Sequence, residues 1–276
     1  MDRFRVEPGS RVSLSGKAAR GPDLVADRKA AEQEMESLAA KLLELQELFY
    51  ADNRYALLII LQGMDTSGKD GVIRHVMRGI NPQGCRVVSF KAPTPEELDH
   101  DYLWRIHQHV PRRGEIGIFN RSHYEDVLAV RVRRLVPEAV WRARYDQINA
   151  FESFLAANGV ILLKLFLHIS REEQEQRLIK RLKNPRKHWK FDPADLPVRA
   201  AWDEYMNACA EMIERCTTET APWHFIPSDR KWLRDLIAAR LVVSTLQGLP
   251  LAWPRGSDET RRLAALVKKT GSLPES

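Results

Sequence analysis

The chain has 276 residues, of which 44% are hydrophobic and 29% charged, so it can bury a substantial core in one large α/β domain or two smaller domains. No apolar run reaches the roughly 18 residues of a membrane span, and the N-terminus lacks the apolar segment of a secretory signal, so we expect neither. The net charge of +6 favours polyanionic partners, but it leaves nucleic acid, acidic membrane surfaces and inorganic polyanions open.

The three cysteines, Cys85, Cys209 and Cys216, form no CxxC or Cys/His group with the spacing of a metal site. We therefore expect neither a disulfide scaffold nor a structural zinc site. A reducing, cytoplasmic setting is the prediction that follows from this cysteine usage.

Helical and strand patterns alternate along the chain. Residues 1–28 are rich in Gly, Arg, Asp and Ser without a clear period, which predicts an N-terminal arm, loose or laid on the surface. The apolar run YALLIIL, residues 55–61, is typical of a buried parallel strand, and it leads into a glycine-rich loop. In the first half of the chain we expect helices over about 29–50, 68–79 and 98–110, a turn at 81–84, and further strands over 86–90 and 116–120.

The second half continues the alternation, with a long helical stretch over about 137–157 before an almost wholly apolar strand over 160–169. Ser170, with Glu173 three residues further on, predicts a capping box at the start of the next helix. Strands that alternate with helices predict an α/β fold of five parallel strands sandwiched by helices, in one domain over residues 29–255. The remaining elements are helices over about 199–216 and 229–247, a short strand near 224–226, and a polar C-terminal tail over 256–276.

The loop GMDTSGKDG, residues 63–71, has the spacing of a phosphate-binding loop but lacks its hydroxyl group. Gly63, Gly68 and Lys69 match the pattern G-x-x-x-x-G-K-[ST], whereas Asp70 stands where a Ser or Thr would hold Mg²⁺. Backbone N–H groups and the positive end of the following helix make phosphate binding reasonable here. We expect Asp65 to hold the metal instead, or to orient the attacking oxygen, and Asp70 to lie along the helix. A tight turn that binds no phosphate is the alternative.

A second group of polar side chains, NRSHYED at residues 120–126, directly follows the third strand. Ligands of open parallel sheets collect at the carboxyl ends of the strands, so these side chains should face the glycine-rich loop. Arg121 suits bidentate binding of phosphoryl oxygens, and Glu125 and Asp126 suit contact with metal or water. A strand end that carries only solvated charges is the alternative.

Basic residues gather over residues 171–200, where we expect a helical lid that closes over an anionic substrate and excludes water. A patch for single-stranded nucleic acid and a plain solvated helix are the alternatives, because basic residues interleaved with aromatic ones also bind single strands. The basic side chains of this segment include Arg171, Arg177, Lys180, Arg181, Lys183, Arg186, Lys187 and Lys190.

Taken together, GMDTSGKDG, FNRSHYEDV and QRLIKRLKNPRKHWKF resemble the polyphosphate kinase 2 family over about residues 28–250. The Tyr-Glu-Asp end of the second motif resembles the class III group. The resemblance implies a P-loop kinase fold, often a homotetramer, and reversible transfer of the terminal phosphoryl group of inorganic polyphosphate to AMP and ADP with Mg²⁺, or Mn²⁺. Asn120 replaces an Asp found in other groups, so Asp126 is expected to take over its metal-ligand role.

The resemblance also implies roles for individual residues. Asp65 and Asp126 would hold Mg²⁺ or orient the acceptor, Lys69 would bind phosphate, Arg121 would stabilise charge in the transition state, and Glu125 would sense the number of acceptor phosphates. Polyphosphate would contact the lid through Arg177, Arg181, Lys183 and Lys187. Phosphate and nucleotide would contact Gly63, Met64, Thr66, Ser67, Gly68, Asp70, Gly71, Asn120, Ser122 and Glu125.

Two other functions share part of this pattern. An ATP-dependent nucleoside monophosphate kinase would have the same loop, lid and fold, and would differ in its phosphoryl donor. A non-enzymatic basic nucleic-acid-binding protein is less compatible, because the carboxylates beside the groove would repel a nucleic-acid backbone; we expect neither nucleic acid nor a membrane as a partner. No histidine is needed for catalysis, since a phosphate acceptor is already mostly ionised at neutral pH.

Overall fold

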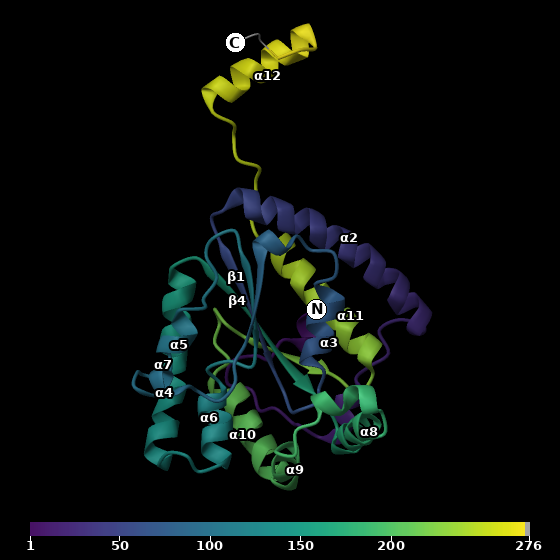
Figure 1. Cartoon of the computed structure of the whole chain (residues 1–276), viewed down its shortest axis with the longest axis vertical. Coiled ribbons are helices and arrows are strands. Elements are labelled where there is room, and N and C mark those ends of the chain that lie inside the picture. The colour runs from purple at the N-terminus through teal and green to yellow at the C-terminus, as the bar shows by residue number, and fades with distance from the viewer. Residues whose placement is uncertain (274–276) are drawn as a thin grey trace.

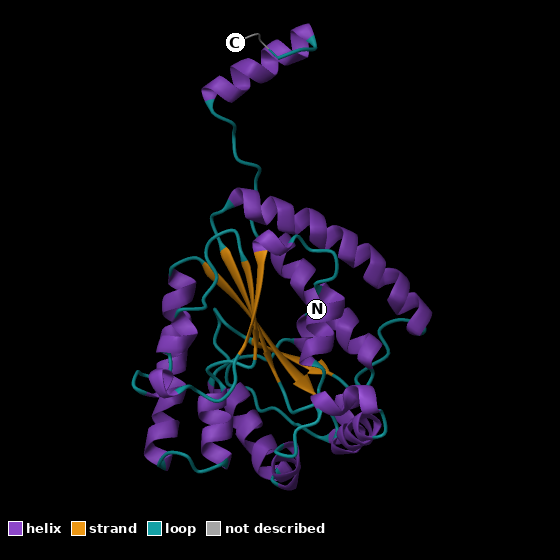
Figure 2. Ribbon diagram, viewed as in Figure 1, coloured by secondary structure: helices purple, strands orange, loops and turns teal. Residues whose placement is uncertain are grey.

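A computed structural model of the chain describes residues 1–273, and its centre is a parallel β-sheet with helices on both faces (Figures 1 and 2). The sheet has five strands in the order β2-β3-β1-β4-β5, and each neighbouring pair is parallel. This confirms the predicted fold class and the number of strands. The strands are β1 (Ala56–Gln62), β2 (Cys85–Ser89), β3 (Ile116–Asn120), β4 (Val160–His168) and β5 (Trp223–Pro227).

The central strand β1 is buried along its whole length, which explains why its sequence is apolar at every position from Ala56 to Leu61. Its side chains alternate between two cores, one on each face of the sheet. Leu58 and Ile60 pack on the face covered by α6 (Glu125–Val132), α7 (Glu138–Ala157) and α10 (Trp202–Arg215). Leu57 and Ile59 pack on the opposite face, which is covered by α2 (Arg28–Asp52), α3 (Lys69–Val76) and α11 (Lys231–Gln247).

Because the strands are parallel, the carboxyl ends of β1, β3 and β4 lie along the same edge of the sheet. The glycine-rich loop follows β1, the polar segment 120–126 follows β3, and α8 (Arg171–Leu182) begins shortly after β4. The segment that was predicted as a lid continues from α8 through a 3₁₀ helix, η3 (Pro185–Lys190), and α9 (Asp195–Ala200). The three motifs of the sequence therefore meet at one edge.

Three local predictions differ from the structure. The helix expected over 98–110 is two short helices, α4 (Pro95–Leu98) and α5 (Trp104–His107), because the Asp101 side chain accepts hydrogen bonds from the N–H groups of Leu103 and Trp104 and starts a new turn. Helix α6, which begins within the polar segment at Glu125, was not expected. Ser170 does accept from the N–H of Glu173, but the Glu173 carboxylate pairs with Arg177 instead of completing the predicted capping box.

The N-terminal arm was predicted to be either loose or laid on the surface, and the structure shows the second alternative. It contains a 3₁₀ turn, η1 (Asp2–Phe4), and a short helix, α1 (Gly16–Arg20), and the side chains of Phe4 and Val6 are buried. The N–H of Val6 donates to the carbonyl of Trp223 at 2.8 Å. The arm thus covers part of the open edge of β5, a position where unpaired strand groups would otherwise invite aggregation.

The C-terminal tail was predicted as polar, and most of its described part is a helix, α12 (Asp258–Thr270). Ser257 caps its start by accepting from the N–H of Thr260, and Gly271 ends it with a left-handed backbone conformation. No residue of α12 is buried, and the helix projects away from the sheet at the top of Figure 1. Residues 274–276 of the predicted tail lie outside the described residues. Within residues 1–273, none of the helices combines the length and the hydropathy that crossing a bilayer requires.

Candidate active site

The loop between β1 and α3 has a backbone that only glycine permits at two positions. Gly63 has φ of 145° and Gly68 has φ of 107°, both in the region that side chains rarely adopt. A Cβ atom at Gly63 would also overlap the carbonyl oxygen of Leu167 on β4. Thr66 has φ of 66°, an unusual value for a β-branched residue and one typical of strained functional loops. These constraints wrap the loop around the N-terminal end of α3.

Lys69 lies across this loop. Its Nζ donates hydrogen bonds to the carbonyl oxygens of Gly63 at 2.7 Å and Met64 at 3.3 Å, and the side chain is buried. Burial lowers the pKa of Lys69. The negative charge of the Asp65 carboxylate opposes this effect, because it favours the protonated form of the lysine. The ammonium group is therefore held at the centre of the loop, as expected of a phosphate-binding lysine.

The polar segment after β3 contacts the loop directly. Arg121 Nη2 lies 2.5 Å from Asp65 Oδ1, and Asn120 Nδ2 donates to Asp70 Oδ1 at 2.9 Å. Burial works to raise the pKa of Asp65, but the charges of Lys69 and Arg121 outweigh it and hold the pKa below its ordinary value. The structure thus brings the first two motifs together. Asp70 lies in the first turn of α3, as predicted.

The two acidic residues at the start of α6 lie beside the loop. Glu125 Oε1 accepts from Gln62 Nε2 at 3.4 Å, and Asp126 Oδ1 accepts from Arg144 Nη1 at 3.0 Å. Burial raises the pKa of Asp126, although the charges of Arg144 and Arg105 oppose this. Both carboxyl groups line the same cavity as Asp65.

This cavity has a volume of about 330 Å³, within the range of ~300–1,000 Å³ typical of small-molecule sites. Its charged lining includes four arginines as well as the three carboxyl groups, while much of the remaining wall is apolar. Such a cavity can hold a ligand that is anionic at one end and flat and apolar at the other. The arginines are Arg105, Arg121, Arg133 and Arg144, and apolar lining residues include Phe90, Leu98, Leu128, Val136 and Val198.

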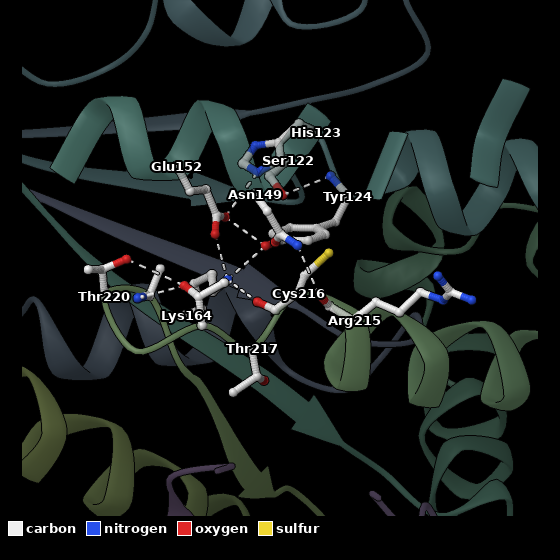
Figure 3. Close-up of polar contacts among 12 residues, drawn as sticks. Ser122, His123, Tyr124, Asn149, Glu152, Lys164, Arg215, Cys216, Thr217 and Thr220 are labelled. Carbon is white, nitrogen blue, oxygen red and sulfur yellow. Dashed lines mark hydrogen bonds and ion pairs between the residues drawn. The ribbon is translucent and has the colours of Figure 1, made fainter. Parts of the chain in front are cut away.

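The residues between Arg121 and Glu125 point the other way, into the core, where they join a buried polar cluster centred on Lys164 (Figure 3). Lys164, on β4, has no exposed surface, and its Nζ donates to Glu152 Oε2 at 2.6 Å, to the Tyr124 hydroxyl at 2.8 Å and to the carbonyl of Cys216 at 2.6 Å. His123 Nε2 lies 3.2 Å from Glu152 Oε1. The cluster therefore fixes, from the side of the core, the segment that carries Arg121 and Glu125.

Ser122 was predicted to contact phosphate or nucleotide, and the structure does not support this. Its side chain is fully buried, and its Oγ accepts a hydrogen bond from the N–H of Tyr124 at 3.3 Å. The physical reason is the direction of the turn after β3. Ser122, His123 and Tyr124 fill the core below the turn, and only the flanking residues reach the cavity.

The lid residues separate into two groups. Arg177 was predicted to contact polyphosphate, but it is buried, and its guanidinium donates to the carbonyls of Thr66, Ser67, Ser228 and Asp229, so this prediction is not supported. Arg181 is half-buried and donates to the carbonyl of Lys190 at 3.0 Å. Lys183 and Lys187 are exposed. These last three side chains remain candidates for a polyanion.

Several residues near the site were missed in the sequence. Burial and the neighbouring Asp65 carboxylate raise the pKa of Asp195, on α9, to about 6. Arg105 on α5, Arg144 on α7 and Arg133, directly after α6, also line the cavity, and none of the three lies within a recognisable motif. The only available signal was the charge of these residues, which is common to most exposed helices.

A phosphate loop with a buried lysine, a second polar strand end and a basic lid meet at the carboxyl edge of a parallel sheet. This combination defines a phosphoryl-transfer protein of the P-loop kinase class, in which catalysis depends on positioning and charge neutralisation.

Comparison with known proteins narrows the class. A family model described as Polyphosphate kinase 2 (PPK2) matches residues 25–250. The chain is 47% identical over 266 residues to a Meiothermus ruber protein named AMP/ADP-polyphosphate phosphotransferase, covering 95% of this chain and 99% of that protein. It is 41% identical over 272 residues to a Rhodopseudomonas palustris protein named ADP-polyphosphate phosphotransferase, covering 94% of each. The crystal structure of polyphosphate kinase 2 from Arthrobacter aurescens TC1 superposes with a TM-score of 0.90 at 40% identity, covering 98% of this chain and 96% of that one. The chain belongs to the polyphosphate kinase 2 family, which confirms the resemblance of its motifs.

Proposed function

We propose that this chain is a kinase that transfers the terminal phosphoryl group of inorganic polyphosphate to AMP and to ADP, giving ADP and ATP. The observation that carries the proposal is the loop carboxylate of Asp65, which stands opposite Arg121 and beside Lys69 at the mouth of a largely apolar cavity. Family membership supports the polyphosphate donor. The name of the Meiothermus ruber relative, with which this chain shares 47% of its residues, supports both acceptors.

The residues divide the work between donor and acceptor. The amides of the loop and Lys69 bind the end of the donor chain, and Arg181, Lys183 and Lys187 of the lid bind phosphates further along it. Arg121 neutralises charge that develops on the transferred group. The second pKa of the acceptor phosphate is about 6, so it is already a nucleophile at neutral pH and needs no strong general base. This agrees with the burial of His123 away from the cavity.

We propose that Asp65 and Asp126 hold Mg²⁺, or Mn²⁺, when the substrates are bound. The donor set fits, because both carboxyl groups line one cavity and a hard divalent cation in such sites takes only one or two protein carboxylates, with phosphate oxygens and water as the other ligands. When bound, the metal would neutralise phosphoryl charge. Arginines pair with both carboxylates in the structure, which keeps them in place.

The acceptor is proposed to lie in the cavity with its base among the apolar residues and its phosphate toward the arginines. Glu125, at the same edge, would sense how many phosphates the acceptor carries, because a carboxylate repels an additional phosphate group. The assembly is proposed to be a homotetramer, by resemblance to the family, and the setting cytoplasmic, which agrees with the free thiols of Cys85, Cys209 and Cys216.

A nucleotide-product assay tests the function. The protein, Mg²⁺ and long-chain polyphosphate are incubated with AMP alone in one reaction and with ADP alone in another. We expect ADP and then ATP to form from AMP, and ATP to form from ADP. If ATP forms in the ADP reaction but no product forms in the AMP reaction, AMP is not an acceptor. No product from polyphosphate, together with phosphorylation of AMP when ATP is the donor, would replace the proposal with an ATP-dependent nucleoside monophosphate kinase.

A further inference from the structure

Two buried arginines contact the backbone of the phosphate loop, and neither is among the described residues that line the cavity. Arg177, on α8, is 6% exposed, and Arg234, on α11, is 2% exposed. Charged side chains are seldom buried this far unless they are paired, so their contacts must offset the loss of hydration. Both arginines have partners outside the loop, namely Asp235 for Arg234 and the carbonyls of Ser228 and Asp229 for Arg177, and both also donate to the loop itself.

Both guanidinium groups hold the same peptide group. Arg177 Nη1 donates to the carbonyl oxygens of Thr66 at 2.9 Å and Ser67 at 3.3 Å, and Arg234 Nη1 donates to that of Ser67 at 3.2 Å. In a trans peptide, the C=O of one residue and the N–H of the next point in opposite directions. With the Ser67 carbonyl held by the arginines, the N–H of Gly68 is directed to the other side, at the start of α3 where an anion binds best.

The position of Arg234 also accounts for two glycines of the motif. A Cβ atom at Gly68 would overlap the Arg234 guanidinium, and one at Gly71 would lie 2.7 Å from its Nη2. No positive φ is recorded for Gly71, so its backbone does not require glycine. What requires glycine there is the space that the guanidinium occupies.

Arg234 is itself held in a fixed orientation. Its Nε and Nη2 donate to Asp235 Oδ1 at 2.8 and 2.6 Å, and Asp235 Oδ2 lies 2.7 Å from His75 Nδ1 on α3. This arrangement uses the planar fork of donors that arginine has and lysine lacks. A lysine at position 234 would keep the charge but could not make these bonds and hold Ser67 at the same time.

We propose that Arg234, acting with Arg177, is a positioning residue for the phosphoryl donor, because it fixes the peptide between Ser67 and Gly68 so that the Gly68 N–H faces the terminal phosphate. The inference rests on the proposed function in one respect, namely that the ligand of the loop is a chain of phosphates. It predicts that Arg234 affects binding of the donor more than binding of the acceptor nucleotide.

The test compares Arg234→Lys with Arg240→Lys. Arg240 is a matched control, because it lies on the same helix and makes a two-bond pair with Glu34, at 2.5 and 2.7 Å, away from the loop. Binding of inorganic tripolyphosphate, without any nucleotide, is measured by titration calorimetry, and KM values for polyphosphate and AMP are measured alongside. We expect Arg234→Lys to weaken tripolyphosphate binding about 10-fold or more and to raise the KM for polyphosphate, with the KM for AMP within about twofold, as expected for loss of an oriented hydrogen bond. Arg240→Lys should bind as the wild type does.

A second variant keeps the test valid if Arg234→Lys does not fold. Gly71→Ala places a methyl group where the guanidinium lies, while alanine favours the helix more than glycine does. Gly248→Ala is its control, since a Cβ there would come no closer than 3.4 Å to its nearest neighbour. Weaker tripolyphosphate binding by Gly71→Ala, with unchanged binding by Gly248→Ala, supports the inference. Wild-type binding by Gly71→Ala and by every Arg234 variant that folds overturns it. Because this binding needs no acceptor and no turnover, its result is independent of whether polyphosphate serves as the donor in the product assay.

Discussion

Lys69 is the residue on which the proposed binding of phosphate by the loop depends most directly. Its ammonium group is buried and contacts two loop carbonyls, Gly63 and Met64, so it lies where a phosphoryl oxygen would meet the loop. Burial lowers the pKa of Lys69, while the nearby carboxylate of Asp65 works in the opposite direction and favours the charged form. A residue of the same length without the charge should therefore leave the loop intact and remove its function.

We expect Lys69→Met to lower kcat/KM by at least about 100-fold, the usual magnitude for removing one preorganised charge from a transition state. The melting temperature should change by only a few degrees, because methionine fills a similar volume. Steady-state kinetics and calorimetry check this, with Lys41→Met, at an exposed position of α2, as the control. Activity near that of the control would show that Lys69 has no part in the reaction.

His224 predicts a dependence of stability on pH. Burial lowers the pKa of His224, on β5, to about 4, whereas an unfolded histidine titrates near 6.5. Between these values the unfolded chain binds a proton that the folded chain does not. The free energy of unfolding should therefore fall as the pH falls from about 6.5 to about 4, by up to about 3 kcal/mol from this residue.

Urea unfolding at pH 4.5 and pH 7 measures this contribution. His224→Gln should lose less stability than the wild type between the two values, while His100→Gln, at an exposed position, should behave as the wild type does. Equal losses in all three proteins would mean that His224 does not cause the acid sensitivity.

The residues that could be predicted from the sequence are those set by short-range patterns. Gly63 and Arg121 follow strands directly and Lys69 ends the loop after β1, so their place at the sheet edge was predictable from the chain order. Arg234 holds Ser67 across a separation of 167 residues, and no local pattern distinguishes it from any other helical arginine. Ser122 was misplaced for the opposite reason, because a polar residue in a polar motif gives no indication of which way a tight turn faces.

At the scale of elements, the buried cluster around Lys164 connects β4 with α7, with α10 and with the segment after β3. Its partners lie 12, 40 and 52 residues away in the chain, which is why an isolated lysine in an apolar strand gave no indication of its role. Burial works to raise the pKa of Glu152, but Lys164 and His123 hold it below its ordinary value, which favours the carboxylate form of Glu152 in the core. By contrast, β1 was predictable because full burial on both faces leaves a continuous apolar run.

Lys164→Met should lower the free energy of unfolding by about 3–5 kcal/mol, because it leaves the Glu152 carboxylate buried without a partner. The double variant Lys164→Met with Glu152→Leu should recover much of that loss, since a well-packed apolar pair can replace a buried ion pair. Denaturant unfolding of both variants checks this. Arg28→Ala, which removes an exposed ion pair with Glu32, should change stability by less than about 1 kcal/mol. A double variant no more stable than the single one would show that the hydroxyl of Tyr124 and the Cys216 carbonyl also require Lys164.

At the scale of the whole molecule, the two ends of the chain are attached very differently. The arm places Phe4 and Val6 in the core and bonds to β5, whereas no residue of α12 is buried. The composition did not distinguish the two ends, because both are polar. What separates them is a pair of apolar side chains near the N-terminus, a signal too short to interpret alone.

A chain that ends at Gly256 should keep its melting temperature within about 2 °C and its kcat within about twofold. Removal of residues 1–7 should instead lower stability by several kcal/mol, because burying each of two apolar side chains contributes roughly 1.5–3 kcal/mol. Calorimetry on the two truncated proteins makes the comparison. A large loss of stability without α12 would mean that this helix packs against another surface, such as a second copy of the chain.

The attachment of Arg177 to the phosphate loop has a consequence for redesigning the enzyme. Ser170 is tied to Asp229, Gln174 contacts the backbone of Asp65, and Arg177 holds Thr66, so the first two turns of α8 are effectively part of the loop. If residues 171–200 act as the proposed lid, any opening must then occur beyond Arg177. Insertions meant to accommodate longer or shorter donors therefore belong in residues 183–192, where the mostly exposed chain can change length while the loop that is proposed to bind the terminal phosphate keeps its geometry.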